Sequence, residues 1–113
     1  KKLIADPIVE KLIRKSLKKS EGELTKADLG KMTTLILNDT QITDAGLRDV
    51  AKMKQLTYIE LVGTKITDAG LKEVAKLQQL TSLNLNNTKV TKAGVAELQK
   101  ALSKCKITHN PTK

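Results

Sequence analysis

The chain has 113 residues, enough for one domain that buries roughly two-thirds of the surface its unfolded form exposes. It contains no Phe or Trp and a single Tyr, so the core must be aliphatic, and the row of aromatic side chains that stacks on single-stranded nucleic acid is excluded. The net charge of +9 is uneven: residues 1–31 and 80–113 carry +4 and +5, whereas residues 32–79 are neutral, so any contact with phosphates depends on the ends.

The first predicted element is an amphipathic helix from Pro7 to about Lys19. Asp6 is a suitable N-cap, and Pro7 takes the first helical position, where Pro is favoured. The apolar residues of the helix fall on one face: Ile8, Val9, Leu12, Ile13 and Leu17. We interpret this stripe as a cap over the end of the core. The alternative is an amphipathic helix that lies on an anionic membrane.

A short edge strand is predicted next, over residues 22–25. Thr25 and Asp28 then form a weak capping box ahead of a helical turn over residues 27–31. Residues 1–31 are therefore predicted to form an N-terminal helical cap.

From residue 32 the chain aligns with itself at an offset of 24, which gives three repeats over residues 32–101. The first half of each repeat, as in residues 56–61, alternates apolar and polar residues and predicts a short strand with one buried face. The second half, as in residues 67–77, predicts an amphipathic helix whose N-caps are Thr43, Thr67 and Thr91. Such units stack into a solenoid with a parallel sheet of about five strands on one face and helices on the other.

The chain ends in a predicted half-repeat and tail over residues 102–113. In it Cys105 and Ile107 take the places of Leu83 and Leu85, and the tail begins at His109. The cap, the three repeats and this last segment are expected to form one domain.

The repeat pattern L-x-x-L-x-L-x-x-T-x-[IV]-T resembles the signature of leucine-rich repeats, with Thr40, Thr64 and Thr88 where that family usually carries Asn or Cys. The helical half resembles the ribonuclease-inhibitor-like or cysteine-containing subtypes, and the segment that begins D-P-x-V-E resembles the helical cap of internalin-type proteins. The resemblance implies an α/β solenoid with a short parallel sheet on the concave face, helices on the convex face and a helical N-terminal cap. It also implies that the three Thr residues form a structural ladder that caps backbone groups.

The same resemblance implies that the concave sheet is the binding surface. By register this face presents Thr34, Ile36, Asn38, Tyr58, Glu60, Val62, Ser82, Asn84 and Asn86. An apolar centre of Ile36, Tyr58 and Val62 with a polar rim is typical of protein interfaces, with Tyr58 as anchor and with Glu60 and Asn84 as orienting contacts. The alternative is that these are ordinary surface residues.

No catalytic residue, metal site or cofactor is predicted. The sequence has no glycine-rich phosphate loop, no paired carboxylates on one face and no nucleophile elbow. Cys105 has no base at a neighbouring repeat position and is interpreted as a small buried residue, and His109 has no second metal ligand at a suitable spacing. We therefore expect that the protein is not an enzyme.

The leading hypothesis is a non-catalytic module that binds a protein or peptide on the concave sheet. The alternative is an electrostatic adaptor for anionic surfaces or nucleic acid that uses basic caps, with the cations Lys11, Arg14, Lys15, Lys18 and Lys19. A third reading is a structural repeat protein without a dedicated ligand. We expect a soluble monomer with no transmembrane segment and disfavour nucleic acid as partner. The missing initiator Met favours a processed chain, which leaves an extracytoplasmic location open.

Overall fold

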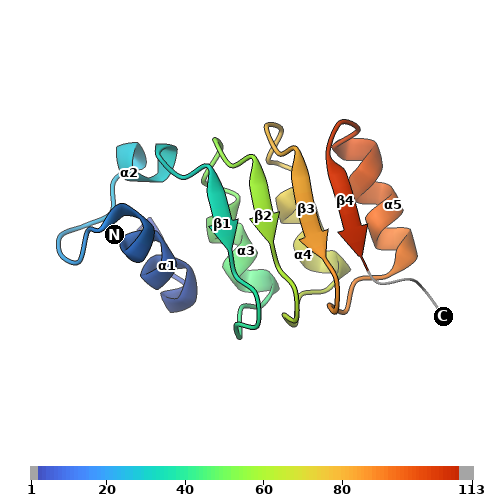
Figure 1. Ribbon diagram of the computed structural model, residues 1–113, viewed down its shortest axis with the longest axis horizontal. Coiled ribbons are helices and arrows are strands. Elements are labelled where there is room, and N and C mark those ends of the chain that lie inside the picture. Colours follow the sequence, from blue (N-terminus) through green and yellow to red (C-terminus); the bar gives the residue numbers. More distant parts are fainter. Residues whose placement is uncertain (1–2, 110–113) are drawn as a thin grey trace.

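A computed structural model describes residues 3–109, in which strands and helices alternate after an N-terminal pair of helices (Figure 1). The elements in chain order are α1 (Pro7–Leu17), α2 (Lys26–Gly30), β1 (Thr34–Ile36), α3 (Asp44–Val50), β2 (Tyr58–Glu60), α4 (Asp68–Val74), β3 (Ser82–Leu85), α5 (Lys92–Ala101) and β4 (Lys106–His109). The molecule measures 46 × 26 × 21 Å. One long dimension is what a stack of repeats along a single axis produces.

The four strands form one parallel sheet in the order β1-β2-β3-β4. Leu35 pairs with Ile59, Ile59 with Leu83 and Leu83 with Ile107, so each strand is displaced from its neighbour by one repeat of 24 residues. In Figure 1 the helices α3, α4 and α5 lie behind this sheet. The predicted solenoid, with a sheet on one face and helices on the other, is confirmed.

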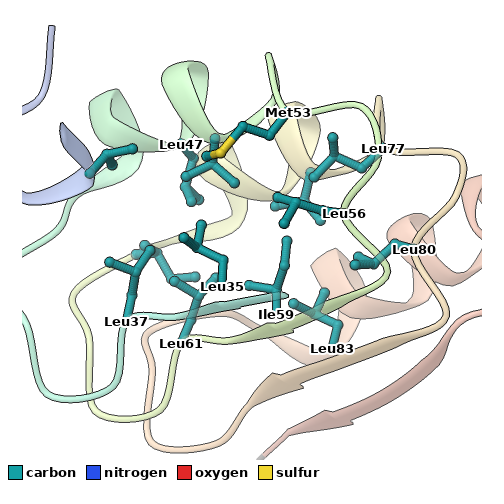
Figure 2. Close-up of a cluster of buried hydrophobic side chains, with 14 of the residues drawn as sticks. Leu35, Leu37, Leu47, Met53, Leu56, Ile59, Leu61, Leu77, Leu80 and Leu83 are labelled. Atoms are coloured by element: carbon teal, nitrogen blue, oxygen red, sulfur yellow. The ribbon is translucent and has the colours of Figure 1, made fainter. Parts of the chain in front are cut away.

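The core fills the space between the sheet and the helices and is aliphatic, as the composition requires. Leu35, Ile59 and Leu83, the central residues of three successive strands, are at most 1% exposed and point toward the helices (Figure 2). Each is covered by apolar residues of the helical half of the repeats, among them Leu47, Leu56, Met53, Leu77 and Leu80 (Figure 2). Burying a Leu or Ile side chain stabilises the fold by about 1.5–3 kcal/mol, so the stack of repeats is the main source of stability.

Helix α1 covers the N-terminal end of this core. The Asp6 carboxylate accepts hydrogen bonds from the backbone N–H groups of Ile8 and Val9, which confirms the predicted N-cap, and Val9 is fully buried with Ile13 on the same face. The helix ends at Leu17 rather than near Lys19, because Lys18 adopts a left-handed conformation with φ 56°. The cap interpretation of the apolar stripe is confirmed, since the stripe packs against the core.

The predicted strand over residues 22–25 is wrong. Arg14 satisfies the carbonyl of Gly22 with a hydrogen bond of 2.7 Å, and Thr25 is the N-cap of α2 with its own N–H bonded to the Asp28 carboxylate. These backbone groups are thus bonded to side chains rather than to a neighbouring strand, and the sheet has four strands instead of about five. The capping box of Thr25 and Asp28 is confirmed.

The prediction for the last half-repeat is wrong by two residues. Ile107, and not Cys105, pairs with Leu83, while His109 belongs to β4 opposite Leu85 rather than to a tail. The reason is that α5 continues to Ala101, three residues beyond the position equivalent to the end of α4, so the following link is short. The predicted tail residues 110–113 lie outside the described residues.

Candidate functional site

The uncovered face of the sheet is built from rows of side chains that run across the strands. Because residues alternate between the two faces of a strand, the residues between the buried positions all point away from the helices. The pairing aligns Thr34, Tyr58, Ser82 and Lys106 in one row and Ile36, Glu60, Asn84 and Thr108 in a second. A third row, Asn38, Val62 and Asn86, follows where the strands end. The structure therefore brings all nine predicted site residues to one face.

Apolar surface on this face is concentrated at the β1–β2 side. Ile36 is 48% exposed and is the one large hydrophobic side chain classed as exposed among residues 3–109. Tyr58 and Val62 are partly exposed. The predicted apolar centre of Ile36, Tyr58 and Val62 therefore exists as surface, although each residue comes from a different row.

A network of polar side chains surrounds this apolar surface. The Glu60 carboxylate accepts a hydrogen bond from the Tyr58 hydroxyl at Oε2 and one of 2.6 Å from the Asn38 amide nitrogen at Oε1. Asn38 in turn accepts the backbone N–H of Val62 at 2.8 Å. Sequence reasoning had proposed Tyr58 and Glu60 as separate contacts, but the structure joins them into one hydrogen-bonded unit.

The electrostatics of this unit follow from its hydrogen bonds. The Tyr58 hydroxyl and then the Asn38 amide stabilise the charged form of Glu60 and lower the pKa of its carboxyl below the usual value. Correspondingly, the hydrogen bond to Glu60 raises the pKa of the Tyr58 phenol. Glu60 is therefore ionised and Tyr58 neutral at ordinary pH.

Tight turns hold the third row in place at the ends of the strands. Asp39, Gly63 and Asn87, spaced one repeat apart, all adopt positive φ angles of 58°, 73° and 61°. Gly, Asn and Asp tolerate this left-handed backbone best, and a side chain at position 63 would also collide with the Asp39 carboxylate. The residues before these turns, among them Asn38, are thereby fixed in position relative to the sheet.

Comparison with known proteins agrees with this architecture. A family model described as "Leucine Rich repeat" matches residues 31–51 and 53–75. The chain is a leucine-rich-repeat protein. Its structure is similar to the crystal structure of an internalin (InlF) from Listeria monocytogenes, with a TM-score of 0.73 and 21% sequence identity over 96% of this chain and 32% of that one. The chain thus spans about a third of that internalin, and the likeness shows a common fold. The search among curated proteins found no match.

The Thr residues of the repeats have the structural role that the leucine-rich-repeat resemblance implied. Thr40, Thr64 and Thr88 each donate their hydroxyl to a carbonyl three residues earlier, at 2.7–2.8 Å. Each bond stays within its own repeat, so these residues close successive turns and do not link one repeat to the next. They face the turn rather than the open surface of the sheet, and nothing in their geometry suggests ligand binding.

Contacts between the leucine-rich repeats come instead from an Asp that sequence reasoning had assigned only to the helix dipole. The Asp44 carboxylate accepts the backbone N–H and the hydroxyl of Thr67, at 2.8 and 2.6 Å, and Asp68 binds Thr91 in the same way. The recurrence of Thr-Asp every 24 residues was the signal that could have revealed this ladder. Thr67 and Thr91 also cap their helices as predicted, whereas Thr43 makes no side-chain capping bond.

The basic N-terminal cap of this leucine-rich-repeat protein is partly neutralised from within. Arg14 bonds to Glu10 and to two backbone carbonyls, and Lys19 forms an ion pair of 2.7 Å with Asp28. Lys11, Lys15 and Lys18 remain exposed. Two of the five cations proposed for an electrostatic adaptor therefore hold the cap together.

The remaining candidates are on the far side of the molecule from the open sheet face or at its end. Cys105 is buried, and burial raises the pKa of its thiol, which disfavours the reactive thiolate. Across residues 3–109, the acidic, Cys and His side chains form no cluster of three suited to a metal ion. None of the described helices has the length and hydropathy needed to cross a membrane.

Proposed function

We propose that the protein is a non-catalytic module that binds a protein or peptide segment on the open face of its sheet. The observation that carries the proposal is that the helices cover only one face of the sheet, which leaves three aligned rows of side chains, with exposed Ile36 among them, available to a partner. Leucine-rich repeats typically serve as protein-binding modules without catalytic activity, which agrees with this assignment.

The size of this face indicates which kind of partner fits. Four strands about 4.8 Å apart span only about 15 Å, much less than the surface that a stable complex of two globular proteins covers. The partner therefore contributes an extended segment or a single loop. Binding is expected to be weak, with a dissociation constant in the micromolar range, or about −8 kcal/mol.

A peptide-display selection against the full chain tests the proposal. Selected peptides are measured against the wild-type protein and against Ile36→Lys, which places a charge in the exposed apolar surface of the sheet face. We expect Ile36→Lys to weaken binding at least tenfold. Lys72→Ala is the matched control, because Lys72 is exposed on helix α4, and it should leave binding unchanged.

Two outcomes would contradict the proposal. One is that Ile36→Lys retains the affinity of every selected peptide while circular dichroism shows both variants folded. The other is that binding falls by orders of magnitude between 50 and 200 mM salt, because such a dependence is typical of phosphate-like contacts through the basic cap rather than of recognition on a nearly neutral sheet.

A further inference from the structure

Glu60 differs from the other well-anchored carboxylates of the protein in having no cation beside it. The described acids with an ion-pair partner are Glu10, Asp28, Asp49, Glu73 and Glu97, each within 4 Å of a Lys or Arg. Asp6, Asp44 and Asp68 instead bind backbone N–H groups at helix N-termini. Glu60 is held by two neutral side-chain donors on the open sheet face, so its negative charge is oriented but not neutralised.

The hydrogen bonds leave both carboxylate oxygens with capacity to spare. An ionised carboxylate offers about four acceptor positions, two on each oxygen. Asn38 uses one on Oε1 and Tyr58 uses one on Oε2. One position on each oxygen remains for a ligand, and Glu60 is partly exposed, so a partner can reach it from the solvent side.

We propose that Tyr58 and Glu60 form a subsite for the guanidinium group of an arginine side chain in the bound segment. This deepens the proposed function and rests on it, because the arginine belongs to the protein or peptide that lies on the sheet. A guanidinium donates two parallel N–H groups to the two oxygens of one carboxylate, and its flat face packs on an aromatic ring. Tyr58 supplies that ring next to Glu60.

The surroundings of the subsite favour arginine over other ligands. Ile36 pairs with Glu60 across β1 and β2, so the aliphatic stem of an arginine can pack on exposed apolar surface beside its charged head. Lys106, the basic residue of the neighbouring row, lies two strands from Tyr58 and therefore roughly 10 Å away, beyond the screening length of about 8 Å at physiological salt. A bound cation thus meets the Glu60 charge without close repulsion. A lysine ammonium lacks the planar fork and is expected to bind more weakly.

The subsite can be tested without knowing the partner, because Tyr58 is the only aromatic residue of the chain and its fluorescence reports on this place alone. The full-length protein is titrated with N-acetylarginine amide and, separately, with N-acetylcitrulline amide, which has the same shape but no charge. We expect a saturable fluorescence change with the arginine probe at millimolar concentration and a response at least tenfold weaker with citrulline. Amide shifts in an NMR titration should place the effect at Ile36, Tyr58 and Glu60.

Matched variants complete the experiment. Glu60→Gln keeps the size of the side chain but removes its charge, and it should abolish the arginine response in the NMR spectrum, whereas Lys72→Gln on helix α4 should preserve it. Equal responses to arginine and citrulline, or an undiminished response of Glu60→Gln, would overturn the subsite.

The outcomes also separate this inference from the proposed function. Peptides that bind the sheet face without enrichment of arginine, together with a silent arginine titration, would overturn the subsite and leave the proposed function standing. An arginine response that depends on Glu60, in a protein for which no peptide or protein ligand of the sheet can be selected, would support the subsite and count against the proposed function.

Discussion

The alternation of buried and exposed residues along the strands can be tested with one residue type placed on both faces of the sheet. Ile59 in β2 is fully buried in the middle of the apolar stack, whereas Ile36 in the adjacent strand β1 is 48% exposed on the open face. Truncating a buried Ile to Ala costs about 2–5 kcal/mol, and the central place of Ile59 puts it near 4. Ile36→Ala should cost less than about 1 kcal/mol, because half of that side chain is already in water.

Urea denaturation followed by circular dichroism measures the difference. With a slope of about 2 kcal/mol per M, Ile59→Ala should lower the midpoint by about 2 M and Ile36→Ala by less than about 0.5 M. If Ile59→Ala fails to fold, Ile59→Val removes a single methylene and should cost about 1 kcal/mol against almost nothing for Ile36→Val. Equal losses at the two positions would refute the assignment of faces on which the binding surface depends.

Three further predictions follow from the polar contacts. Asp44→Ala removes both hydrogen bonds to Thr67 and should cost about 2 kcal/mol of unfolding free energy in the same urea assay; no loss would mean that the ladder between repeats is not stabilising. Alkaline titration of the phenolate absorbance should give Tyr58 a pKa above its usual 10.0, and Glu60→Gln should lower it, so the stability that the pair contributes is present below pH 10 and lost as the pH rises past the folded-state pKa. The pKa of Asp28 is lowered to about 2 by its bond to Lys19, so its contribution to stability should be complete above about pH 4 and vanish as the pH falls through 2; Asp28→Asn should flatten that part of the urea midpoint's pH profile, and an unchanged profile would contradict the assignment.

The sequence was most informative where the same pattern recurs in every repeat. Strand, turn and helix each leave a periodic signal, and three copies in phase reinforce it, so the register that aligns Tyr58 with Ser82 followed from the offset of 24 residues alone. The rows of the candidate site could therefore be predicted before any coordinate was known. In contrast, the apparent strand over residues 22–25 was decided by Arg14, a side chain eight residues away, whose bond to the Gly22 carbonyl has no periodic signature.

The finer geometry of the site could not be predicted because it depends on contacts between side chains of different rows. Register places Asn38 and Glu60 in adjacent repeats, but it does not show that one donates to the other while Tyr58 binds the second carboxylate oxygen. The last strand was misplaced for a related reason. The longer α5 changes the link to β4, and the burial of Cys105 imitates a strand position that Ile107 in fact occupies.

The central claim is that a partner lies on the open face of the sheet. It is tested most directly by recording amide shifts of the isotopically labelled protein during titration with a selected peptide. The account predicts that the changes gather along β1 to β3, at residues such as Ile36, Tyr58, Glu60 and Asn84, while α3 and α4 remain silent. Changes concentrated in α1 or along the outer surfaces of α3 and α4, with the sheet unaffected, would contradict it.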